Sequence, residues 1–158
     1  MNNNKLPTRS SSAEVQEFLS KVARTPKVVT SGQTGRIIFA MDATASREAS
    51  WDQASNLQGE MFQETASKGG LEIQLVYFRG FGEFRVSSWT SKSSDLLGLM
   101  TEVRCRAGET QIRKVLGHAL SETKKQSVDA LIFIGDNVEE DIDSLGATAG
   151  ELGLLGVP

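Results

Sequence analysis

Two patterns of apolar residues alternate along this chain: continuous runs, and repeats at helical spacing. Residues 37–41 (IIFAM) and 128–134 (VDALIFI) form largely apolar runs, and each is closely followed by an aspartate, Asp42 after the first and Asp136 after the second. Short runs of this kind are typical of strands that are buried on both faces of a sheet. We therefore predict two buried strands with polar chemistry at their carboxyl ends.

Two further segments predict strands that pair with each other. Residues 71–78 alternate polar and apolar positions before becoming apolar, and residues 84–89 follow after a turn that contains Gly80 and Gly82. A glycine-rich turn between two such segments favours an antiparallel hairpin. We expect the second strand of this hairpin to lie at an edge of the sheet.

Apolar residues recur every three or four positions between these strands, which predicts helices. The predicted helices cover residues 51–66, 93–103, 112–120 and 139–152. Strands that alternate with helices in this order are typical of an α/β domain. We therefore predict a three-layer α-β-α, Rossmann-like fold with a mostly parallel central sheet and one antiparallel edge strand.

The two ends of the chain differ from this central pattern. Residues 1–35 predict a disordered polar leader, a short amphipathic helix from Ser12 and a connector, and the α/β domain is expected to cover residues 36–158. Residues 155–158 resemble the start of a fifth strand. We therefore expect the sequence to be a truncated form of a longer protein, without the C-terminal strands and helix of the fold.

Composition narrows the classes of function. The chain has 158 residues, 39% of them hydrophobic, and a net charge of −3, which fits one domain and does not favour nucleic acid or an anionic membrane as the main partner. It contains neither a signal peptide nor a membrane-spanning apolar run, so we expect a cytoplasmic protein. The lone Cys105 is interpreted as a buried thiol, and His118 as a packed or surface residue without an obvious partner.

Oxygen-bearing side chains gather where the two buried strands are expected to end. The spacing Asp42-x-Thr44-x-Ser46 places three of them at alternate positions of one loop, Asp136 follows the other strand, and Thr110 lies at the start of a predicted helix. Ligands of open α/β sheets bind beyond the carboxyl ends of the strands. Because carboxylate and hydroxyl oxygens suit hard cations, the pattern predicts a site for Mg²⁺, with Mn²⁺ or Ca²⁺ as alternatives.

From Arg36 to Pro158 the sequence resembles the von Willebrand factor A (VWA) family, in a bacterial-type, intracellular, stand-alone form. The metal-ion-dependent adhesion site (MIDAS) of that family reads Asp-x-Ser-x-Ser, then a distant Thr and a distant Asp. The five matching residues are Asp42, Thr44, Ser46, Thr110 and Asp136. The resemblance implies a protein-binding module whose metal accepts an Asp or Glu of a protein partner. It implies no enzyme and no catalytic residues.

Three alternatives to this interpretation remain. Asp42 and Ser46 could cap a helix that begins near Arg47, while Asp136 occupies a turn. A phosphohydrolase similar to the haloacid dehalogenases also places an Asp after its first strand, but it needs a second acid at the position of Thr44, where threonine cannot act as a general acid. The chain could also be a structural module that interacts through its N-terminal helix.

Residues around the expected metal loop would add specificity for the partner. We expect this of Arg79, Phe81 and Gly82 in the hairpin turn and of Arg106 before Thr110. The basic cluster around Arg106 is interspersed with glutamates, so a solvated surface is a better interpretation of it than a dedicated anion site.

Overall fold

The computed structural model describes residues 34–67 and 70–158. The expected leader, N-terminal helix and most of the connector lie outside these residues. No helix in the described part of the chain combines the length and the apolar character needed to cross a bilayer. The elements in chain order are β1 (Gly35–Asp42), the 3₁₀ helix η1 (Ala45–Arg47), α2 (Glu48–Ser67), β2 (Leu71–Arg79), β3 (Glu83–Val86), α3 (Ser93–Glu102), α4 (Ile112–Lys125), β4 (Ala130–Ile134) and α5 (Ile142–Leu154).

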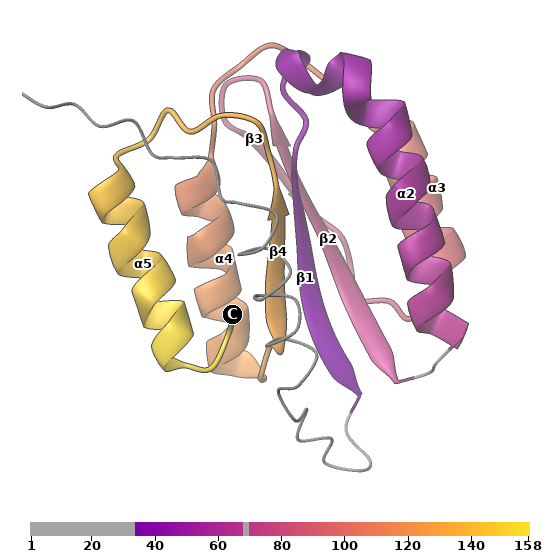
Figure 1. The fold of residues 1–158 in the computed structure, drawn as a ribbon. Coiled ribbons are helices and arrows are strands. Elements are labelled where there is room, and N and C mark those ends of the chain that lie inside the picture. Colours follow the sequence, from indigo (N-terminus) through magenta and orange to yellow (C-terminus); the bar gives the residue numbers. More distant parts are fainter. Residues whose placement is uncertain (1–33, 68–69) are drawn as a thin grey trace, which may run out of the picture. The chain divides into compact units, whose positions relative to one another are not determined.

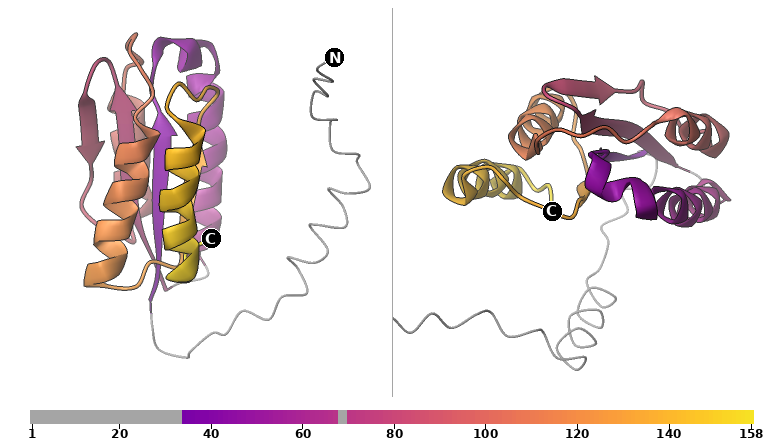
Figure 2. Two further views of the ribbon diagram at one scale, coloured as in Figure 1. Left: turned by 90° about the vertical axis from the view of Figure 1, so that its left-hand side faces the viewer. Right: turned by 90° about the horizontal axis from the view of Figure 1, so that it is seen from above.

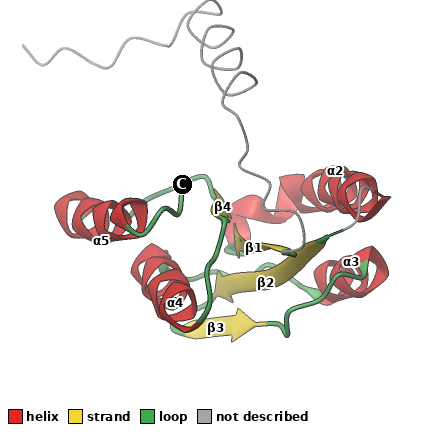
Figure 3. Cartoon of the chain, turned by 90° about the horizontal axis from the view of Figure 1, so that it is seen from below, coloured by secondary structure: helices red, strands yellow, loops and turns green. Residues whose placement is uncertain are grey.

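The strands form one mixed sheet in the order β3-β2-β1-β4 (Figure 3). The strand β1 pairs in parallel with β2 and with β4, and β3 pairs antiparallel with β2. The predicted hairpin and its place at an edge of the sheet are therefore confirmed. The registers set Asp42 opposite Phe78 and Met41 opposite Ile134, so β1, β2 and β4 end on the same side of the sheet.

Helices cover both faces of the sheet, which confirms the three-layer prediction (Figures 1 and 2). Alternate residues of β1 point to opposite faces. Ile38 and Ala40 pack against α4 and α5, whereas Phe39 and Met41 pack against α2 and α3. Each face therefore buries its own apolar cluster, and together these clusters hold the strand ends in place.

The strand β4 differs from the prediction. It was expected to be buried on both faces, yet all five of its residues are only partly buried. The reason is its position, because β4 pairs with β1 alone among the described strands and forms an edge of the sheet. One backbone hydrogen bond lies on its outer side, where Leu131 N donates to the Pro158 carbonyl oxygen.

The start of the last helix also differs from the prediction. We expected a helix from Glu139, but α5 begins at Ile142, after Asp141 as its N-terminal cap. The Asp141 carboxylate accepts a hydrogen bond from Ser144 N at 2.9 Å, as capping residues do. The preceding residues Glu139 and Glu140 are thereby free to reach another part of the fold.

Candidate metal site

Asp42 ends β1 and is 1% exposed. Its Oδ1 accepts a hydrogen bond from Thr44 N at 2.8 Å. Its Oδ2 is also buried, and it has no hydrogen-bond partner among the described residues. A buried carboxylate oxygen without a partner is costly, since its lost hydration is not replaced. The site therefore contains an acceptor that a cation could satisfy.

A chain of polar contacts connects the loop after β1 to the loop after β4. The hydroxyl oxygens of Thr44 and Ser46 lie 3.2 Å apart, and Ser46 Oγ donates to Asp136 Oδ1 at 3.2 Å. The loop after β4 runs directly beside Asp42, because a Cβ on Gly135 would lie 3.4 Å from Asp42 Cβ. Four of the five predicted ligands thus lie at one end of the sheet.

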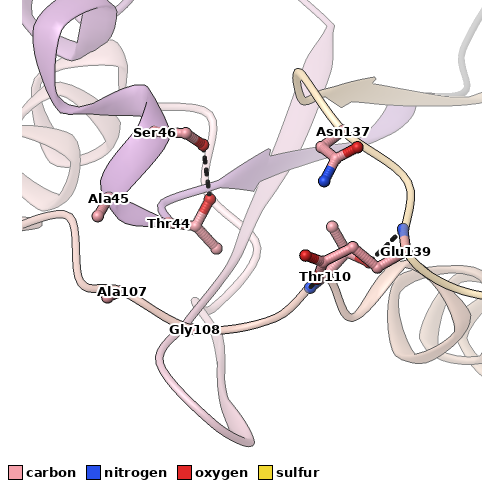
Figure 4. Close-up of a pocket in the computed structure, with 8 residues that line it drawn as sticks. All are labelled: Thr44, Ala45, Ser46, Ala107, Gly108, Thr110, Asn137 and Glu139. Carbon is pink, nitrogen blue, oxygen red and sulfur yellow. Dashed lines mark hydrogen bonds between the residues drawn. The ribbon is translucent and has the colours of Figure 1, made fainter.

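The fifth predicted ligand, Thr110, lines a pocket of about 240 Å³ together with Thr44 and Ser46. Figure 4 shows Thr44 and Ser46 on one side of this pocket, with Thr110, Asn137 and Glu139 on the other. Thr110 is 7% exposed, and its Oγ1 accepts a hydrogen bond from Glu139 N at 3.1 Å. A hydroxyl oxygen has two lone pairs, so this bond leaves Thr110 Oγ1 able to take a second partner.

The capping alternative accounts for part of this arrangement only. Thr44 precedes η1, but its side chain makes no capping hydrogen bond. Ser46 Oγ donates to Asp136 across the site, a contact that capping does not require. Asp42 Oδ1 does stabilise its own loop through Thr44 N, which is the local role that capping predicts. Asp42 Oδ2 and the contact between Ser46 and Asp136 remain unexplained by capping.

Sequence reasoning missed two acidic residues, Glu139 and Glu140, because both were placed inside a helix. The Glu139 carboxylate accepts a hydrogen bond from Thr110 N at 2.9 Å and lines the pocket. The Glu140 carboxylate accepts from the backbone N–H groups of Ile112 and Arg113, at the start of α4. The cap Asp141, three residues before Ser144, was the local signal that α5 begins later.

Neither of the two isolated residues singled out from the sequence, Cys105 and His118, lines the candidate pocket. Cys105 is half-buried, and burial raises the pKa of its thiol, which disfavours a reactive thiolate. His118 was expected to have no obvious partner, but its Nε2 lies 2.7 Å from Gln74 Oε1. The amide oxygen can only accept, so His118 Nε2 donates this bond.

The donor set fits a hard divalent cation. It consists of two carboxylates and three hydroxyl groups, and oxygen ligands of this kind suit Mg²⁺, Mn²⁺ and Ca²⁺. In residues 34–67 and 70–158, no group of three or more His, Cys, Asp or Glu side chains could hold a metal. A soft, thiolate- or imidazole-rich centre is therefore not found in this part of the chain.

No protein-family model and no curated protein matches this sequence. Solved structures do resemble its fold. The SpRpn10 VWA domain superposes with a TM-score of 0.59 at 14% identity, over 78% of this chain and 71% of that one. Proximal thread matrix protein 1 from the mussel byssus, in a structure with a zinc-occupied MIDAS motif, has a TM-score of 0.56 at 20% identity, over 79% of this chain and 34% of that one.

The pilus adhesin SpaC from Lactobacillus rhamnosus GG is a third similar structure. Its TM-score is 0.58 at 14% identity, and the match covers 67% of this chain and 15% of the adhesin. This chain therefore spans only a small part of the adhesin and about a third of the mussel protein. At these identities the likeness concerns the fold, and it agrees with the sheet order and the helical layers described above. The described part of this chain has a von Willebrand factor A-like α/β fold.

Proposed function

We propose that this domain is a metal-dependent protein-interaction module that binds one divalent cation. The proposed ligands are Asp42, Thr44, Ser46, Thr110 and Asp136, and the proposed cation is Mg²⁺, with Mn²⁺ or Ca²⁺ as alternatives. The observation that carries the proposal is the buried Oδ2 of Asp42, which has no partner among the described residues. A cation would supply the charge and the contact that this oxygen lacks.

The bound cation would serve to recognise a group of a partner. Five protein oxygens leave Mg²⁺ one short of its preferred six ligands, so water or an incoming group completes the set. The pocket beside Thr44, Ser46 and Thr110 provides the space for such a group. The group that suits it best is a carboxylate, since it is a hard, negatively charged oxygen ligand. We therefore propose a protein partner that offers an Asp or Glu side chain.

The similar structures support the coarser part of this proposal. They include a pilus adhesin and a mussel byssus protein whose MIDAS motif holds zinc. The pocket of the present chain is lined by hydroxyl, amide and carboxylate groups and by small residues, without a thiol or an imidazole. This lining favours a hard cation such as Mg²⁺.

A direct metal titration tests the proposal. Isothermal titration calorimetry with Mn²⁺ should show one site per chain in the wild type, and Asp42→Asn should remove it. Asp42→Asn keeps an oxygen that can accept from Thr44 N, so the loop should survive the change. Asp52→Asn, a change of an exposed aspartate on α2, is the matched control and should bind Mn²⁺ like the wild type. A wild type that takes up no Mn²⁺ at tens of millimolar would overturn the proposal.

The phosphohydrolase alternative has a separate test. Thr44 lines the pocket at the position where such an enzyme needs its general acid, and a threonine hydroxyl cannot supply that proton. We therefore expect no release of phosphate from p-nitrophenyl phosphate in the presence of Mg²⁺. Turnover that Asp42→Asn abolishes would contradict the binding function in favour of the enzyme.

A further inference from the structure

An exposed aromatic residue stands close to the candidate metal pocket. Phe81 lies in the turn between β2 and β3 and is 83% exposed. Its neighbours Gly80 and Gly82 have φ values of +59° and +95°, in the left-handed region that favours glycine. The two glycines therefore allow a tight turn that carries a large apolar side chain into solvent.

The turn is held against the loop that leads to Thr110. Gly80 N donates to the Arg106 carbonyl oxygen at 3.3 Å, and Glu109 N donates to the Gly80 carbonyl oxygen at 3.2 Å. Gly108 lines the metal pocket, and a Cβ added to it would lie 1.9 Å from Gly80 O. The backbone before Phe81 therefore touches the wall of the pocket. When a partner binds a side chain on such a fixed backbone, less conformational entropy is lost than when it binds a side chain on a free loop.

Positive charge gathers around the same turn. Glu83 lies 3.0 Å from Arg79 and 3.5 Å from both Arg85 and Arg106, so one carboxylate faces three guanidinium groups. A hydrogen bond from Arg79 lowers the pKa of Glu83, which keeps that carboxylate ionised at neutral pH. Lys114 Nζ donates to Gly82 O at 3.4 Å and adds a fourth cation.

Two acidic residues lie in the turn region and in the loop that packs on it. Of the acidic residues around the turn, Glu83 is shared by three arginines, and Glu109 is exposed in the adjacent loop. Four cations therefore face these two carboxylates at the turn itself, and Glu139 and Glu140 add two more carboxylates at Thr110 and at the start of α4. Arg106 is 68% exposed at its side chain, so it can turn toward a new partner at little cost.

We propose that Phe81 and Arg106 form a second contact area for the partner of the metal site. The partner is an acidic protein segment that supplies one carboxylate to the cation, an apolar side chain to Phe81 and a further carboxylate to Arg106. This inference rests on the proposed function. A solitary exposed apolar residue is ordinary. Phe81 differs because its backbone is fixed beside the pocket and because the arginines around Glu83 can pair with carboxylates of a partner.

Selection from random peptides tests the composition of the partner without assuming its spacing. Phage-displayed dodecapeptides are panned on the wild type in Mn²⁺ and eluted with EDTA. The eluted peptides should share an Asp or Glu, an aromatic or aliphatic residue near it and a second acidic residue. A recovered peptide is then synthesised with a fluorophore, and its affinity is measured by fluorescence polarisation.

Matched variants locate the contact on the protein. Phe81→Ser should weaken peptide binding roughly tenfold, as expected for an aromatic contact worth about 1.4 kcal/mol, and Arg106→Glu should weaken it by a similar factor. Both variants should bind Mn²⁺ like the wild type. The controls are Leu154→Ser, another exposed apolar residue, and Lys124→Glu, another exposed cation in a 3.5 Å ion pair with a glutamate. Both should bind the peptide like the wild type.

Several results would overturn the inference. Mn²⁺ binding without recovery of any peptide contradicts it, and so do eluted peptides with an acid but no shared apolar residue. Equal peptide affinity of wild type, Phe81→Ser and Arg106→Glu contradicts the assigned surface while leaving the metal site intact. A single-stranded RNA oligonucleotide that binds more tightly than the peptides, through the same two residues and in EDTA, would assign the surface to nucleic acid instead. Absence of Mn²⁺ binding would contradict the proposed function as well.

Discussion

Thr110 and Glu139 lie 29 residues apart in the sequence and exchange two hydrogen bonds. Thr110 N donates to a carboxylate oxygen of Glu139 at 2.9 Å, and Glu139 N donates to Thr110 Oγ1 at 3.1 Å. The pair connects the loop before α4 to the loop before α5. Groups that orient a metal ligand usually affect metal affinity although they do not touch the metal. Glu139 is therefore expected to position Thr110 for the cation.

The variant Glu139→Ala should weaken binding of Mn²⁺ roughly tenfold or more, as loss of such an orienting group does. Glu140→Ala is its matched control, because Glu140 accepts hydrogen bonds from the start of α4 and not from Thr110. This control should lower the free energy of unfolding by about 1 kcal/mol, as loss of a helix cap does, with metal affinity close to that of the wild type. Calorimetric titration and urea unfolding separate the two effects. Equal Mn²⁺ affinity in both variants would show that Glu139 has no positioning role.

Divalent metal should stabilise the folded state. A ligand that binds only the folded chain adds about 2.7 kcal/mol to its stability at 100 times its Kd, which raises Tm by several degrees for a domain of this size. Asp42→Asn should remove the response to Mg²⁺. In EDTA this variant should be at least as stable as the wild type, because it loses a buried charge that lacks a full set of partners.

Thermal melts in Mg²⁺, Mn²⁺ and EDTA measure this effect, with an ionic-strength control for the highest metal concentrations. Asp42→Ala is less suitable than Asp42→Asn, because alanine also leaves the buried Thr44 N without its acceptor. Identical wild-type melting temperatures in all three solutions would count against the metal site.

The close packing of Gly108 against Gly80 leads to a third prediction, which concerns stability. A Cβ on Gly108 would lie 1.9 Å from Gly80 O, so Gly108→Ala must push the hairpin turn away from the pocket. We expect a loss of about 1–3 kcal/mol in the free energy of unfolding, as for other overpacked sites. Gly117→Ala on α4 is the control, because its Cβ meets nothing within 4 Å, and it should raise stability by about 0.5–1 kcal/mol. Equal effects of the two changes in urea unfolding would refute the packing argument.

Because of the surroundings of the His118 imidazole, we expect the stability of the fold to depend on pH. Burial lowers its pKa in the folded state, although the nearby Glu122 raises it, and Lys125 lowers it further. As pH falls through about 6.5, the ordinary pKa of histidine, the unfolded chain therefore binds more protons than the folded chain. The free energy of unfolding should accordingly decrease between pH 7.5 and 5.5.

His118→Gln should reduce this decrease, because glutamine does not titrate and can still donate to Gln74. Urea unfolding of both proteins at several pH values measures the difference. An unchanged slope in the variant would assign the pH dependence to other groups.

Within the described residues, the sequence by itself predicted the strands and α-helices and their order. Continuous apolar runs and helical repeats reflect local side-chain periods, and these periods follow from the geometry of strands and helices. The same local logic placed Asp42 and Asp136 after two buried strands, and the structure makes these strands, β1 and β4, neighbours. It could therefore predict that carboxylates and hydroxyls meet at one end of the sheet, and the contact between Ser46 and Asp136 agrees with this prediction.

Only the tertiary structure decided which distant groups meet. It placed β4 at an edge, where its apolar residues stay partly exposed, although the same residues would be buried in a central strand. It also set the start of α5 at Ile142. As a result, the Glu139 carboxylate accepts a hydrogen bond from Thr110 N, and the Glu140 carboxylate accepts one from the backbone at the start of α4. A local pattern cannot show these contacts. A glutamate carboxylate can accept hydrogen bonds in the first turn of its own helix or from the backbone of a loop 29 residues away. Packing of the whole chain selects between these two partners.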